Sequence, residues 1–110
     1  MNSEPSVAVI RLGGELEIGR REEIGNALHV SGNERAILVD LSEATYADST
    51  TLAELLRFRR DAERENVRVA VIIANRQFAR LIAYAGLSEA FAIFADRGSA
   101  LTYLASGNRA

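Results

Sequence analysis

Residues 36–56 read AILVDLSEATYADSTTLAELL, and this stretch decides the expected fold. The apolar run Ala36–Val39 is bounded by charged residues and has the length of a strand that is buried on both faces. The run Asp48–Thr50 carries short polar side chains that cap the free N–H groups of a first helical turn. We therefore expect a buried strand that ends at Asp40, an exposed loop and a helix over Asp48–Glu65.

Strands and helices alternate on both sides of this stretch. The predicted helix over Asp48–Glu65 presents an apolar stripe with Phe58 beside it, and the stripe consists of Leu52, Leu55, Leu56 and Ala62. The other expected elements are the strands Val7–Leu12 and Glu15–Ile18 around Gly13-Gly14, a helix from Gly19 to about Ser31, the strand Arg68–Ala74, the helix Arg76–Ala85 stopped by Gly86, the strand Phe91–Phe94 and the helix Arg97–Leu104.

This order predicts an α/β domain with a mixed, mostly parallel sheet of about five strands and about four helices. The first two strands are expected to pair as a hairpin at the edge of the sheet. We expect one domain over residues 1–110, with a core at about 7–105. Because so short a chain has few helices to spare, one face of the sheet should be covered well and the other poorly, which leaves a surface where a partner could dock.

The composition excludes several kinds of chemistry. With no Cys and a single His, His29, the chain offers no disulfide framework, thiolate zinc site or thiol nucleophile, and we expect no metal and no cofactor. The 13 basic and 15 acidic residues give a net charge of −2, which argues against a nucleic-acid binder. The longest apolar run, Val69–Ala74, is too short to cross a bilayer, and residues 1–5 lack the pattern of a signal peptide, so a cytoplasmic protein is expected.

Several short motifs in this order resemble the STAS domain of bacterial anti-sigma factor antagonists. The Asp48–Leu52 box follows a strand that ends in Asp40-Leu41-Ser42, and Leu12–Glu17 resembles the family's opening Gly-Glu-Leu-Asp hairpin. The segment Gly86–Phe94 and the later Ser99-Ala100-Leu101 resemble the C-terminal part of the domain. The resemblance extends from about Val7 to Leu104, nearly the whole chain.

The resemblance implies a regulatory protein that is itself not an enzyme. Ser49, directly after the Asp of the box, corresponds to the serine phosphorylated by a partner that is both anti-sigma factor and kinase, with a histidine-kinase-like ATPase fold. The unphosphorylated domain binds this partner and releases a sigma factor, and a PP2C-type phosphatase later removes the phosphate. Thr50 is a second, less favoured acceptor. A phosphate adds about −1.5 to −2 charges at neutral pH, and Asp48 beside it would sharpen the repulsion of a partner.

Two residues depart from the family pattern. Thr51 stands where the family usually has Gly, and Glu54 stands where a small or apolar residue is common. We expect both to change the surface that a partner contacts. Glu17, where an Asp is typical, is expected to contribute a contact at the docking face.

Two further residues are candidates for the same surface. Asp40 ends a strand where open α/β sheets place ligand groups, and we expect it to shape the surface around Ser49. Tyr46 lies in the predicted loop before the box, where it is equally suited to anchor a partner or to pack beneath the loop.

Alternative functions remain open at this point. A STAS domain could instead serve as a scaffold in a stress-signalling assembly or as the small cytoplasmic partner of a lipid or anion transport system. The altered residues Thr51 and Glu54 are the reason for retaining this alternative. A weak homodimer is also considered. A small hydrolase with Ser49 as nucleophile is rejected, because no base is in evidence and His29 lies on another predicted helix.

Overall fold

The computed structural model describes residues 7–106. A short 3₁₀ turn, η1, lies between the second strand and the first α-helix. The elements are β1 (Val7–Arg11), β2 (Gly14–Leu16), η1 (Ile18–Arg20), α1 (Arg21–Ala27), β3 (Ala36–Asp40), β4 (Ala44–Ala47), α2 (Ser49–Arg64), β5 (Arg68–Ile72), α3 (Arg76–Tyr84), β6 (Ala92–Phe94) and α4 (Arg97–Ser106).

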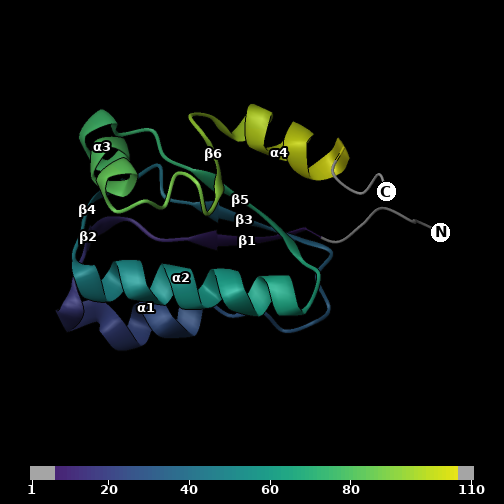
Figure 1. Cartoon of the computed structure of the whole chain (residues 1–110), viewed down its shortest axis with the longest axis horizontal. Helices are drawn as coiled ribbons and strands as arrows, with labels where there is room; N and C mark the ends of the chain where they lie inside the picture. The colour runs from purple at the N-terminus through teal and green to yellow at the C-terminus, as the bar shows by residue number, and fades with distance from the viewer. Residues whose placement is uncertain (1–6, 107–110) are drawn as a thin grey trace.

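The strands form two sheets. The main sheet has four strands in the order β1-β3-β5-β6, and each neighbouring pair is parallel. A smaller sheet has two parallel strands, β2 and β4, at one end of the molecule (Figure 1). The predicted α/β class with a mostly parallel sheet and four α-helices is confirmed for the residues that the structure describes.

The predicted hairpin between the first two strands is wrong. The Gly13-Gly14 pair does not reverse the chain, because the Leu12 amide donates to Asp40 O (3.2 Å) and the Gly14 amide to Glu43 O (2.9 Å). Gly14 has a φ of 76°, a conformation that glycine adopts without strain. The chain therefore follows the path of β3 and its continuation, so that β2 pairs with β4, a strand in a segment expected to be a loop.

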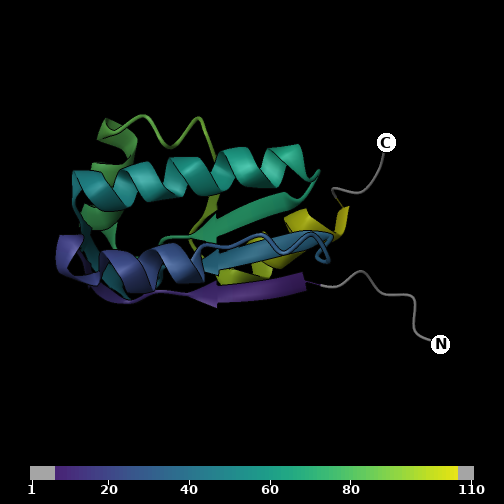
Figure 2. The same ribbon diagram turned by 90° about the horizontal axis from the view of Figure 1, so that it is seen from below.

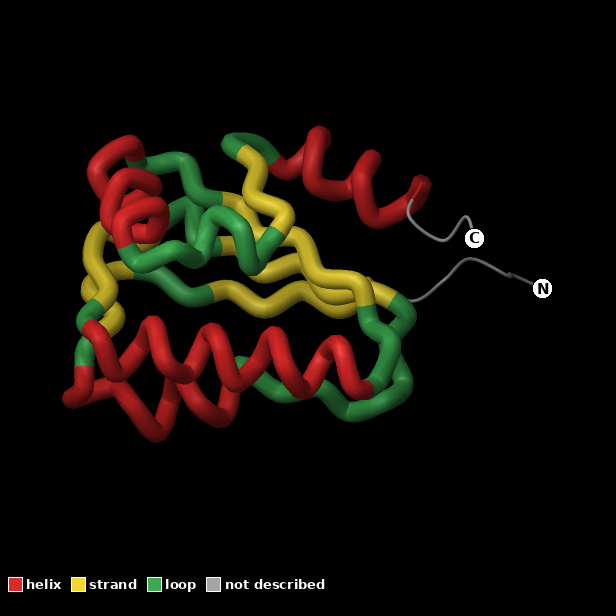
Figure 3. The backbone as a smooth tube through the Cα atoms, viewed as in Figure 1, coloured by secondary structure: helices red, strands yellow, loops and turns green. Residues whose placement is uncertain are grey.

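Helices cover the two faces of the main sheet unequally. Helices α1 and α2 lie side by side over one face, as Figure 2 shows, and with α3 they enclose the larger hydrophobic core. The opposite face packs only a small cluster against α4, formed by Ala36, Leu38, Ala70, Ile72, Ala100 and Leu104. Figure 3 shows α4 on the side of the strands opposite α1 and α2. The expectation of one well-covered and one poorly covered face is confirmed.

Helix α2 agrees with its expected bounds but is rotated from its expected orientation. Asp48 is its N-cap and Glu65 its C-cap. Its buried residues are Thr51, Leu55, Phe58 and Ala62, whereas Leu56, expected in the apolar stripe, is exposed. The stripe that faces the core is thus displaced toward Thr51.

The remaining helices show smaller differences. The helix expected from Gly19 to Ser31 is shorter, since α1 covers only Arg21–Ala27 after the turn η1. Helix α3 ends as predicted, with Gly86 just beyond it in the left-handed region at a φ of 79°. Within residues 7–106, no helix combines the length and the apolar character needed to cross a membrane.

Candidate functional site

Asp48 joins the start of α2 to the turn η1. One carboxylate oxygen, Oδ1, accepts from the Thr51 amide (3.0 Å), which caps α2, and the other, Oδ2, accepts from the Ile18 amide (2.8 Å). The hydrogen bond from Thr51, together with that from Ile18, outweighs the effect of desolvation and holds the pKa of Asp48 below its ordinary value. Asp48 is thus ionised at neutral pH, and its carboxylate is engaged within the fold.

Thr51 is buried directly beneath the start of α2, contrary to our expectation that it lies on a partner surface. Its side chain is 1% exposed, and its hydroxyl donates to Leu16 O at 2.8 Å. The same carbonyl accepts from the Asp48 amide at 3.1 Å. The methyl group of Thr51 packs in the core and its hydroxyl bonds to the last residue of β2, so Thr51 supports the start of α2 from within the fold.

Replacing Thr51 with valine should destabilise the fold by about 1 kcal/mol, because the valine keeps the volume of the side chain but loses the buried hydrogen bond. Leu16 O retains the Asp48 amide as a donor, which limits the loss. Urea unfolding measures the effect. The matched control is Thr50→Val, at a half-buried position whose hydroxyl makes no hydrogen bond among the described residues, where a change below about 0.5 kcal/mol is expected. Equal losses in the two variants would contradict the role given to the Thr51 hydroxyl.

Ser49 is presented to solvent at the first position of α2. It is exposed, and within residues 7–106 its hydroxyl has no hydrogen-bond partner. Thr50, the alternative acceptor, is half-buried. Because the Asp48 carboxylate already accepts from the first-turn amide of Thr51, a phosphate on Ser49 would project outward beside an existing negative charge.

Two exposed apolar side chains lie near Ser49. Ile18, whose amide is bound to Asp48, is 65% exposed, and Tyr46, in β4 shortly before the helix, is 47% exposed. Glu17 precedes Ile18 and is also exposed. We call this region the α2-start surface; it consists of Glu17, Ile18, Tyr46, Asp48, Ser49 and Thr50. It combines an exposed hydroxyl, exposed apolar side chains and carboxylates.

The structure shows whether Tyr46 packs beneath a loop, and it exposes Ile18, a residue that the sequence did not predict for this surface. Tyr46 points outward from a strand and does not pack beneath a loop. Ile18 was expected to end a strand, but β2 stops at Leu16 and Ile18 begins η1. Nothing in the local pattern predicts this turn, because the bond that forms it comes from Asp48, distant in sequence.

Glu54 faces the groove between α1 and α2. Its side chain is 18% exposed and pairs with Arg57 at 2.9 Å and, more loosely, with Arg21 at 4.0 Å. Arg57 also donates to Leu28 O (3.2 Å) beyond the end of α1 and pairs with Asp61 at 2.9 Å. The carboxylate of Glu54 is thus already paired with arginines of α1 and α2, and the expectation that it changes a partner surface stays a prediction.

The groove that contains Glu54 continues from the α2-start surface, because Ile18 belongs to both. It has a volume of about 500 Å³, and its walls are formed by Ile18, Gly19, Arg21, Glu22, Gly25, Asn26 and Glu54. A partner that contacts Ile18 can thus extend along α1.

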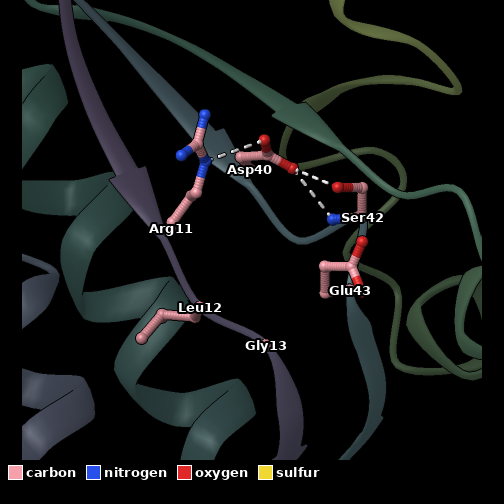
Figure 4. Close-up of a pocket in the computed structure, with 6 residues that line it drawn as sticks. All are labelled: Arg11, Leu12, Gly13, Asp40, Ser42 and Glu43. Carbon is pink, nitrogen blue, oxygen red and sulfur yellow. Dashed lines mark hydrogen bonds and ion pairs between the residues drawn. The ribbon is translucent and has the colours of Figure 1, made fainter.

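Asp40 lies at the carboxyl end of β3 in a separate hollow of about 430 Å³ (Figure 4). Its carboxylate accepts from the amide (3.0 Å) and hydroxyl (2.6 Å) of Ser42 and pairs with Arg11 at 3.5 Å. Partial burial alone would raise the pKa of Asp40, but these bonds from Ser42 and Arg11 lower it. Among the residues that the structure describes, Asp40 bonds with Ser42, Arg11 and Arg97 and with no residue of α2, so its expected role in shaping the Ser49 surface has no structural support.

Solved structures share this arrangement of elements. An anti-sigma factor antagonist from Mycobacterium paratuberculosis superposes with a TM-score of 0.82 at 22% identity, over 94% of this chain and 89% of that one. A sulfate transporter family protein from Wolinella succinogenes gives 0.78 at 16% identity, over 89% and 84%. The anti-sigma factor antagonist SpoIIAA in its unphosphorylated form gives 0.65 at 17% identity, over 97% and 96%. At these identities the similarity shows the fold alone.

Sequence comparison assigns the family. No curated protein matches the chain by sequence. The family model described as "Mlab, STAS domain" matches residues 1–95, which is most of the chain, and the solved structures of similar fold agree with it. The chain therefore belongs to this STAS domain family.

Proposed function

We propose that this STAS domain is an anti-sigma factor antagonist that binds its partner through the α2-start surface and is released when Ser49 is phosphorylated. The observation that carries the proposal is the geometry of Ser49, an exposed hydroxyl without an internal partner at the rigid start of a capped helix. A kinase can reach such a hydroxyl without unfolding the domain. In this proposal the domain is the substrate of a kinase and does not itself catalyse a reaction.

The partner in this proposal is an anti-sigma factor with a histidine-kinase-like ATPase fold. It binds the unphosphorylated domain, gives up its sigma factor and then phosphorylates Ser49, and a PP2C-type phosphatase restores the domain. The similarity of the fold to two anti-sigma factor antagonists supports this choice. The switch is electrostatic, because a phosphate beside the ionised Asp48 adds charge to an interface that must be desolvated for binding.

A second candidate uses the same surface for a different partner. The description of the matching family model and the similarity to a sulfate transporter family protein favour an accessory module of a transport system. Such a module would contact a transport protein through the α2-start surface without a phosphorylation cycle. The two candidates therefore share the docking surface and differ in the identity of the partner and in the fate of Ser49.

Removing the two apolar side chains of the docking surface should weaken binding without weakening the fold. The double variant Ile18→Ser/Tyr46→Ser should bind the anti-sigma factor about tenfold more weakly by titration calorimetry, because both side chains lose contact area on a partner. The matched control is Tyr84→Ser, at a tyrosine that is 83% exposed on α3 and outside the surface. Unchanged affinity in the double variant, or an equal loss in the control, would place the interface elsewhere.

A further inference from the structure

Strand β1 is an unprotected edge of the main sheet. It pairs with β3 on one side only. The Leu12 amide donates to Asp40 O of the β3 side, and amides alternate in direction along a strand, so those of Ala8 and Ile10 also face β3. The backbone groups of Val7, Val9 and Arg11 therefore point away from the sheet. Within residues 7–106, none of these outward groups has a hydrogen-bond partner.

Apolar side chains border this edge on the poorly covered face. Val9 is in register with Leu38 and Val7 with Ala36, both of which pack against α4, so the two valines point to the α4 side. They are 43% and 39% exposed, because α4 packs over β3, β5 and β6 and leaves β1 largely uncovered.

Helix α4 adds one more apolar side chain to this side. Tyr103 packs on Phe94 of β6, with ring centroids 5.3 Å apart, while Ala100 and Leu104 face the sheet. Leu101 is rotated by about 100° around the helix axis from Ala100, onto the flank opposite Tyr103. Its side chain therefore points toward β1. It is 36% exposed. Val7, Val9 and Leu101 are thus exposed apolar side chains on the α4 side of this edge.

Natural edge strands usually carry a lysine, a proline or a bulge that prevents pairing. Strand β1 has none of these, and its only charge is Arg11 at its end. We propose that β1 pairs antiparallel with β1 of a second copy of this chain, about a twofold axis through Val9, to give one continuous sheet in a transient homodimer. This proposal is independent of the partner at α2.

The sequence of β1 is complementary to itself in this register. Val9 exchanges both backbone hydrogen bonds with Val9 of the copy, and Val7 does the same with Arg11, since these are the residues whose backbone groups point outward. Ala8 then stands opposite Ile10, a small residue against a large one, on the face covered by α1 and α2. The two Arg11 side chains lie at opposite ends of the junction, and each stays paired with its own Asp40.

The extent of the edge sets the strength of the contact. A junction between two five-residue strands with their few flanking side chains falls below the roughly 1,200 Å² that specific stable interfaces bury. The dimer should therefore form only at high concentration. A short strand from another protein could use the same edge, but the self-complementary register favours a second copy.

Sedimentation equilibrium of the full chain tests the proposal. Between about 10 μM and about 1 mM, the weight-average mass should rise from that of the monomer toward that of the dimer. Val9→Pro should abolish the rise, because it removes an amide that points away from β3 and so leaves the β1–β3 ladder intact. Val9→Thr, which keeps the amide and the shape, should retain it. Circular dichroism and thermal melting of each variant confirm that the fold is present.

Two results would overturn the proposal. The first is a wild-type chain that stays monomeric over the whole concentration range, which would leave the edge to a different occupant or to none. The second is a dimer that persists in a folded Val9→Pro variant, which would place the contact on another surface. Because neither experiment uses a partner protein or a phosphate, failure here leaves the proposal for the α2-start surface unaffected.

Discussion

Replacing Asp48 with alanine is expected to lower the melting temperature by roughly 5 to 15 °C, the largest effect on stability among our substitutions. The variant loses the cap of α2 and the bond that holds η1 against it, and it leaves the amides of Thr51 and Ile18 without their acceptor. Differential scanning calorimetry measures the shift. If the melting temperature of Asp48→Ala fell no further than that of Thr51→Val, water would be replacing the carboxylate as hydrogen-bond acceptor with little loss of stability.

Two comparisons separate the functions of Asp48. Asn is a good N-cap but presents an N–H₂ group to the Ile18 amide, so Asp48→Asn should melt between the wild type and the alanine variant. The pKa of Asp48 is lowered in the folded state, so its contribution is complete above the unfolded value of about 4 and is lost as the pH falls through the folded value. The difference between the wild type and Asp48→Ala should therefore shrink below about pH 4, whereas a constant difference would contradict the ionic origin of the effect.

Phosphorylation of Ser49 is expected to weaken binding to the anti-sigma factor by about 100-fold, the largest effect on binding. Ser49 is exposed beside the ionised Asp48, so a phosphate there adds negative charge that must be desolvated against the partner. Ser49→Asp, with a smaller charge, should produce part of the loss. Titration calorimetry with purified partner measures both.

The control for charge is Ser88→Asp, at an exposed serine after α3 that lies outside the α2-start surface. It adds the same charge to the chain and should leave the affinity unchanged. Equal weakening by Ser88→Asp and Ser49→Asp would show a general effect of net charge, and the assignment of the interface to the start of α2 would then be lost.

The local features of α2 could be predicted from the sequence because they depend on neighbouring residues. The Asp-Ser-Thr run is a strong start signal, and Asp48 caps the helix as expected. The burial of Thr51 was also encoded, since Thr51, Leu55, Phe58 and Ala62 recur at helical spacing. We missed it by giving weight to the apolar Leu52 and Leu56 over a threonine whose hydroxyl finds a partner in the core.

The features that escaped prediction depend on contacts between distant segments. The strand at β2 was expected with the wrong partner, and β4 was expected to be part of a loop. The two strands pair because Gly14 continues the chain beside Glu43. Likewise, the exposure of Ile18 results from a bond to Asp48, and the role of Glu54 results from arginines on two helices. A local pattern cannot distinguish a carboxylate offered to a partner from one neutralised across a groove.

The central claim is that Ser49 is the acceptor of a regulatory phosphate, and mass spectrometry tests it most directly. The chain is incubated with ATP, Mg²⁺ and the anti-sigma kinase encoded in the same genome, and intact and fragment masses are recorded. The account predicts one phosphate on Ser49, and none on Ser49→Ala, which should still bind the kinase. A chain that binds the kinase but gains no phosphate at Ser49, or gains it elsewhere, would contradict the account. A chain that neither binds the kinase nor gains a phosphate would favour the transport module.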